Sequence, residues 1–116
     1  MRPRRLERLQ WVELEGCPRA YVATTAPSRL LGLAWLDGLP EGVGLLIPGC
    51  KSVHTFGMRF DLDVEFLDAD WQVLRRVEAM PPRRLLWCRG AAAVLERKAG
   101  GLRTHGGRNL PTAGAG

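Results

Sequence analysis

The side chains best suited to chemistry lie between residues 50 and 63. Cys50 and His54 stand four residues apart, and Asp63 follows within an alternating apolar and acidic run. A thiolate is a nucleophile and an imidazole can act as its general base, so Cys50 and His54 suit covalent catalysis. A carboxylate near His54 can orient the imidazole for acid–base work. No complete catalytic motif accompanies them, and a small half-buried thiol is the simpler interpretation of Cys50.

The segment from His54 to Arg59 also suits a ligand pocket. His54, Thr55 and Arg59 would line it, with Asp63 nearby and Arg29 as a further contributor from a predicted helix. The planar guanidinium group of arginine binds carboxylates and phosphates through two parallel hydrogen bonds. A small anionic compound is therefore the ligand that these residues favour.

The same segment has an equally direct structural interpretation. Gly57 can supply a bulge, Met58 can fill the core, and Arg59 can pair with an acid such as Asp63. In this interpretation the motif specifies the fold and binds nothing.

Metal binding and disulfide bonding find little support. Zinc sites use three or four protein ligands. Beyond Cys50 and His54, the remaining soft ligands are Cys17, Cys88 and His105, and none shows ligand spacing. An odd number of cysteines without a short CxxC spacing favours reduced thiols. The sequence therefore predicts no metal site and no cofactor.

Composition indicates a single globular domain inside the cell. The 116 residues carry a formal net charge of +5, concentrated in arginines and lysines near the two ends. Nucleic-acid binding through these basic ends is a weak alternative, because no recognition motif supports it. No apolar run reaches the ~18–20 residues that span a bilayer, and the N-terminal region does not resemble a signal peptide. We expect a cytoplasmic protein.

Apolar periodicity and turn residues predict a chain of short strands. A helix is expected at residues 27–35, where proline suits the first turn. The clearest strand alternates strictly between apolar and acidic residues, from Phe60 to Phe66. Strands are expected at residues 10–15, 19–24, 43–47, 60–66 and 71–79.

The two central strands are expected to form a hairpin. A two-residue loop at Ala69 and Asp70 would place Asp63 opposite Arg76, an attractive pair worth roughly 0.2–1 kcal/mol. After the Pro81-Pro82 stop, residues 83–90 are predicted to be a loop. Trp87 within that loop is interpreted as a packing residue.

The run His54-Thr55-Phe56-Gly57-Met58-Arg59-Phe60, followed by Leu62-Asp63-Val64-Glu65-Phe66-Leu67-Asp68, resembles the domain of unknown function family 192. The similarity extends over roughly residues 12–100. It implies a compact fold dominated by antiparallel strands, with one short helix packed on a curved or barrel-like sheet. It also makes residues 94–97 a strand. Asp61 replaces the proline usual in the family, and the resemblance supplies no enzymatic activity.

Together these observations predict an α+β domain at residues 1–100, mostly antiparallel β. Residues 1–8 form a flexible basic lead, and residues 101–116 form a glycine-rich disordered tail. The leading hypothesis is a non-enzymatic binding or accessory module that holds a small anionic ligand or a protein segment near His54–Arg59. The alternative is a small hydrolase-like enzyme that uses His54 and Asp63, with Cys50 as an optional third group.

Overall fold

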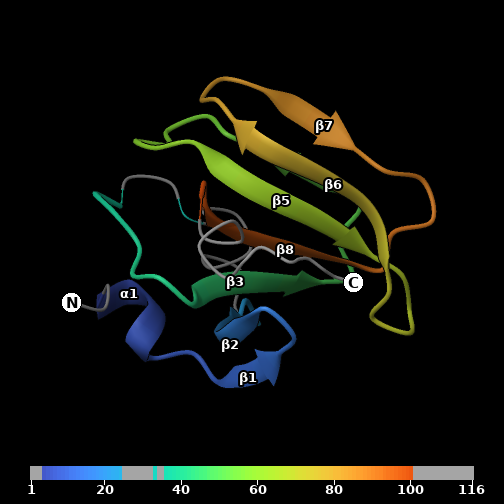
Figure 1. Ribbon diagram of the computed structural model, residues 1–116, viewed down its shortest axis with the longest axis horizontal. Helices are drawn as coiled ribbons and strands as arrows, with labels where there is room; N and C mark the ends of the chain where they lie inside the picture. Colours follow the sequence, from blue (N-terminus) through green and yellow to red (C-terminus); the bar gives the residue numbers. More distant parts are fainter. Residues whose placement is uncertain (1–3, 25–32, 34–35, 101–116) are drawn as a thin grey trace.

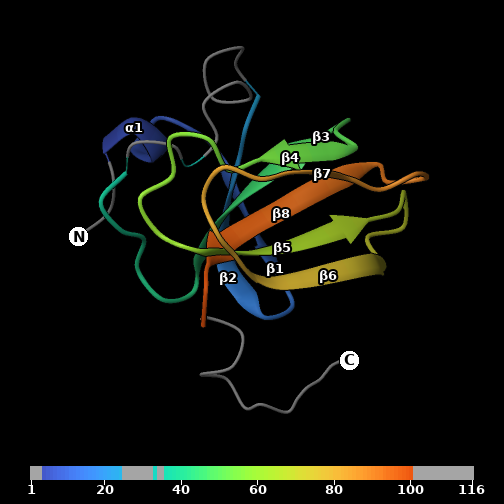
Figure 2. The ribbon, with the colours of Figure 1, turned by 90° about the horizontal axis from the view of Figure 1, so that it is seen from above.

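The computed structural model describes residues 4–24, 33 and 36–100. Most of its secondary structure is strand, arranged in two sheets (Figures 1 and 2). The elements are α1 (Arg4–Glu7), β1 (Trp11–Leu14), β2 (Cys17–Val22), β3 (Val43–Pro48), β4 (Ser52–His54), β5 (Leu62–Leu67), β6 (Val73–Met80), β7 (Leu85–Trp87) and β8 (Ala93–Lys98).

Six strands form an open sheet in the order β1-β2-β3-β8-β5-β6, and β4 pairs with β7 in a separate two-stranded sheet. Every pairing is antiparallel except the parallel contact between β2 and β3. The mostly antiparallel class predicted from the sequence is confirmed. The larger sheet is not closed into a barrel, because β1 and β6 remain as its two edges.

The N-terminal region differs from the expected flexible lead. Residues Arg4–Glu7 form the short helix α1, and the Leu6 side chain is buried in the main core. The helix expected at residues 27–35 falls almost wholly outside the described residues, and Leu33, which is described, lies in a turn. The tail at residues 101–116 also lies outside them. Within the described residues, no helix has the length and apolar character needed to cross a membrane.

The two faces of the larger sheet carry separate apolar clusters. The main cluster includes Tyr21, Leu45, Val64 and Phe66, and a smaller cluster of mostly small and aliphatic residues lies on the other face. The two-stranded sheet joins the main cluster through Val53. Burial of these side chains supplies the main driving force for the fold.

The β5–β6 hairpin closes through a longer loop than predicted. The Asp68 carboxylate accepts hydrogen bonds from the Asp70 and Gln72 N–H groups at 2.8 and 3.0 Å. The Asp68 N–H donates to the Gln72 carbonyl at 2.9 Å, and Trp71 adopts a φ of 67°. The prediction of a two-residue loop at Ala69 and Asp70 is therefore wrong, because the Asp68 side chain stabilises a wider turn.

The register of the hairpin changes accordingly. Arg76 lies opposite Glu65 rather than Asp63. An opposite-charge pair does stabilise the hairpin, as expected, but the prediction named the wrong carboxylate. Glu65 is buried, and its Oε2 accepts a hydrogen bond from Arg76 Nε at 2.9 Å.

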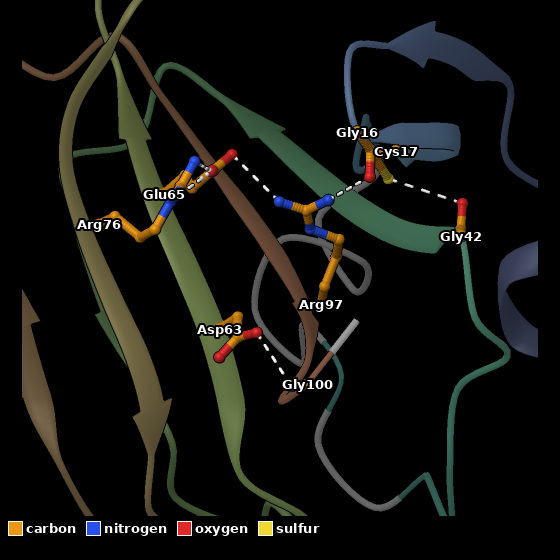
Figure 3. A network of polar contacts seen from close by, with 8 residues as sticks. All are labelled: Gly16, Cys17, Gly42, Asp63, Glu65, Arg76, Arg97 and Gly100. Atoms are coloured by element: carbon orange, nitrogen blue, oxygen red, sulfur yellow. Dashed lines mark hydrogen bonds and ion pairs between the residues drawn. The ribbon is translucent and has the colours of Figure 1, made fainter. Parts of the chain in front are cut away.

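A buried network extends this pair across the sheet (Figure 3). Arg97 on β8 places Nη2 3.3 Å from Glu65 Oε1 and donates from Nη1 to the Gly16 carbonyl. The network thus joins β5, β6 and β8 to the β1–β2 turn. Gly44 on β3 leaves room for it, since a Cβ there would lie 2.9 Å from Arg97 Cγ.

A carboxyl group also lies within the core. Glu96 on β8 is buried, with Leu45 and Val64 as its neighbours on the adjacent strands. Burial disfavours the charged form and raises the pKa of Glu96 to about 8. At neutral pH this side chain is a neutral acid.

This burial predicts a specific pH dependence of stability. The folded protein keeps the Glu96 proton up to about pH 8, whereas the unfolded chain releases it near 4.5. The unfolded state therefore binds fewer protons in that interval, and this group lowers the free energy of unfolding by about 1.4 kcal/mol per pH unit as the pH rises.

Urea denaturation at a series of pH values checks this expectation. Glu96→Gln should gain stability relative to the parent protein as the pH rises from about 4.5 to 8. Glu13→Gln, at an exposed position, serves as the control and should follow the parent. A difference between Glu96→Gln and the parent that is independent of pH would show that the carboxyl group is not buried as described.

Candidate functional site

The structure describes four of the five residues predicted to line a pocket. Thr55 and Asp63 are buried, whereas His54 and Arg59 are exposed. Arg29 lies outside the described residues. The four described residues lie in different environments, and the small-anion pocket that would include Arg29 stays a prediction.

Thr55 is fully buried and joins two distant segments. Its hydroxyl group donates to the Pro81 carbonyl at 2.7 Å and accepts from the Arg84 N–H at 2.8 Å. Its own N–H donates to the Arg84 carbonyl at 2.9 Å, and its carbonyl accepts from the Met58 and Arg83 N–H groups. Thr55 therefore positions the chain that leads into β7.

Asp63 is buried and also bonded to backbone. Oδ1 accepts from the Ala79 N–H at 2.9 Å. Oδ2 accepts from the Gly100 N–H at 3.0 Å, the bond drawn in Figure 3. Ala79 has a φ of 53° and lies where the β5–β6 register shifts, as in a β-bulge. The carboxylate thus stabilises the bulge and the turn after β8. Asp63 is thus buried with backbone partners, whereas His54 is exposed, and no hydrogen bond or ion pair joins the two in the described part of the chain.

Arg59 has an acidic partner, as the structural interpretation expected, but the partner is Asp37. Both side chains are exposed, at 52% for Arg59 and 88% for Asp37. Exposed ion pairs contribute about 0–1 kcal/mol, so this contact adds little to stability.

The three cysteines are free thiols. The Cys50 thiol donates to the Ser52 carbonyl at 2.9 Å. Burial raises the pKa of Cys17 to about 11, which keeps that thiol protonated at neutral pH. Among residues 4–24, 33 and 36–100, no group of three or more histidine, cysteine or acidic side chains is arranged to hold a metal ion.

The β4–β7 sheet presents an exposed apolar surface that sequence reasoning missed. Val53 and Leu86 contact the main core, so the alternate residues of both strands face outward. The outward side chains and the neighbouring Phe56 form what we term the ribbon face: Ser52, His54, Phe56, Leu85 and Trp87. The exposed fractions of Phe56, Leu85 and Trp87 are 54%, 59% and 66%.

Two aromatic rings meet on the ribbon face. The centroids of His54 and Phe56 are 6.0 Å apart with an interplanar angle of 33°. Trp87, predicted to be a packing residue in a loop, instead lies on a strand with its side chain mostly exposed. The only sequence feature that indicates this strand is the Leu-Leu-Trp run, which is too short to show a two-residue periodicity.

The chain segments that contain the ribbon face carry charges of one sign only. Residues 49–60 and 79–92 contain no aspartate or glutamate. Exposed cationic side chains flank the two strands at Lys51, Arg83, Arg84 and Arg89. These side chains attract anionic groups.

Thr55 allows a direct test of the architectural role. Thr55→Val removes the hydroxyl group and leaves the Pro81 carbonyl and the Arg84 N–H without that partner. We expect a loss of about 2–3 kcal/mol in the free energy of unfolding, measured by urea denaturation. Thr55→Ser, which keeps the hydroxyl group, should lose clearly less. Equal stability of the two variants would contradict the role of the hydroxyl group.

Two solved structures share this fold. One is a protein of unknown function from Novosphingobium aromaticivorans, with a TM-score of 0.64 and 24% identity over 71% of this chain and 64% of that chain, less than two thirds of its length. The other, from Sinorhizobium meliloti, is provisionally described as a transcription regulator; it has a TM-score of 0.68 and 22% identity over 76% of this chain and 74% of that chain. At these identities the similarity shows the fold alone.

No functionally curated protein matches the chain. The family model of domain of unknown function 192 (DUF192, uncharacterized ACR) matches residues 12–109, most of the sequence. This match confirms the resemblance inferred from the His54–Asp68 region. The chain belongs to the DUF192 family.

Proposed function

We propose that this protein is a non-enzymatic binding module whose ribbon face docks a segment of a partner protein. The observation that carries the proposal is the exposure of Phe56, Leu85 and Trp87, each more than half exposed, on one surface. Contiguous exposed apolar side chains mark interaction sites, and aromatic residues are enriched in protein interfaces.

The ribbon face rests on a firmly held support. Val53 lies beneath it in the main core, Leu86 packs against that core, and Thr55 fixes the start of β7 through hydrogen bonds. A surface that is ordered before binding loses less conformational entropy when a partner arrives. This arrangement favours docking of a partner without rearrangement of the two strands.

The rival functions draw less support from the same residues. A small-anion pocket would need Thr55 and Asp63, and both are occupied by backbone hydrogen bonds. A hydrolase-like site would need a carboxylate to orient His54, and Asp63 is engaged elsewhere. His54 serves better as part of an apolar and aromatic docking surface.

Selection of random peptides displayed on phage against the full chain tests this proposal. We expect enriched peptides whose binding falls about tenfold or more in Trp87→Ser and Phe56→Ser, as is typical of interface aromatic anchors. Trp11→Ser is the matched control, because Trp11 is an exposed tryptophan on edge strand β1. Binding should be measured by fluorescence anisotropy of the synthetic peptides.

Two outcomes would overturn the proposal. The first is failure to enrich any peptide from a diverse library. The second is enrichment of peptides that bind the Trp87→Ser and Phe56→Ser variants as tightly as the Trp11→Ser control. Circular dichroism should confirm that all three variants remain folded.

A further inference from the structure

Within the described part of the chain, one edge of strand β7 pairs with β4 and the other edge has no strand partner. The Cys88 N–H donates to the Lys51 carbonyl, and the Thr55 N–H donates to the Arg84 carbonyl, both at 2.9 Å. These two bonds fix the phase of the ladder, because bonded and non-bonded pairs alternate between antiparallel strands.

The phase determines which backbone groups face outward. Trp87 pairs with Ser52 and Leu85 pairs with His54, and both are non-bonded pairs in this ladder. The N–H and C=O groups of Leu85 and Trp87 therefore point away from β4. The same two residues carry the most exposed large apolar side chains of the described chain. The backbone groups and the side chains of these two residues are thus both available to contact a partner.

The cationic side chains on either side of β7 determine which kind of chain can pair with this edge. Arg83 and Arg84 precede β7 and Arg89 follows it, and no acidic residue lies between positions 79 and 92. Cationic side chains at an edge strand oppose pairing with a second copy of the same edge. They favour a chain of opposite charge.

We propose that the free edge of β7 takes up an extended acidic segment of a partner protein as a third strand of the β4–β7 sheet. This inference rests on the proposed function and specifies the partner and its conformation. The segment forms backbone hydrogen bonds with Leu85 and Trp87, as in β-strand addition. Its apolar side chains pack on the ribbon face, and its acidic ends lie near Arg83, Arg84 and Arg89.

The peptide Glu-Glu-Val-Thr-Val-Glu-Glu, with capped ends, is a suitable probe. Titration into the isotope-labelled full chain should shift the amide resonances of residues 84–88 and slow hydrogen exchange at the Leu85 and Trp87 amides. A matched peptide with lysine in place of glutamate should bind at least tenfold more weakly. N-methylation of the valine amides, which removes hydrogen-bond donors from the segment, should have a similar effect.

Variants of the chain test the charge requirement. The double variant Arg83→Gln/Arg84→Gln should weaken binding of the glutamate peptide several-fold, and the loss should shrink at high salt. Arg75→Gln, an exposed arginine on β6, is the control and should bind as the parent does. Equal affinity for the glutamate and lysine peptides would overturn the acidic preference.

Other outcomes separate this inference from the proposed function. If the glutamate peptide and its N-methylated form bind equally, and the Leu85 and Trp87 amides are not protected, strand addition is wrong while docking on the ribbon face stands. If no acidic peptide binds, but phage-selected peptides without acidic residues depend on Trp87, the inference alone fails. If oligothymidylate binds in a Trp87-dependent manner and no peptide does, both proposals fail in favour of a nucleic-acid partner.

Discussion

The arrangement around the ribbon face depends on the buried hydroxyl group of Thr55. That group bonds the Pro81 carbonyl and the Arg84 N–H, while the Thr55 backbone bonds Arg84 and Arg83. A buried polar group without partners is costly, so the two segments gain by remaining together. Their contact brings β4 beside β7 and directs alternate residues of both strands outward. The exposed surface is therefore a consequence of a buried polar contact.

Strands with a long apolar pattern could be predicted from the sequence. Features that depend on tertiary contacts, such as strand register and the pairing of short strands, could not. Strands were expected at residues 10–15, 19–24, 43–47 and 60–66, and β1, β2, β3 and β5 lie close to these positions. The alternation in β5 indicated a strand but not its full burial, because Asp63 and Glu65 are buried as well. The register of β5 and β6 was not predicted correctly, because the Asp68 side chain stabilises a wider turn. Strands β4 and β7 have three residues each, too few for any period to be recognised. Their pairing comes from contacts between segments distant in the sequence.

The candidate site likewise combines features that the sequence indicates with features that tertiary contacts determine. Residue type suggested that His54, Thr55 and Asp63 could act together in chemistry. Type alone does not reveal that Thr55 and Asp63 would find partners among backbone groups from other parts of the chain. Once those partners are known, the central motif divides into buried residues that maintain the fold and outward residues that remain available. The DUF192 family match is consistent with either role, since the family carries no assigned activity.

Native-state hydrogen exchange of the unliganded protein tests the central claim most directly, because it reports the protection of individual amides. The Arg84 and Ala79 amides donate to the buried side chains of Thr55 and Asp63, so they should exchange slowly. The Leu85 and Trp87 amides face the free edge of β7 and should exchange rapidly. Rapid exchange at Arg84 and Ala79, together with protection at Leu85 and Trp87, would contradict both the architectural role of the motif and the availability of the edge.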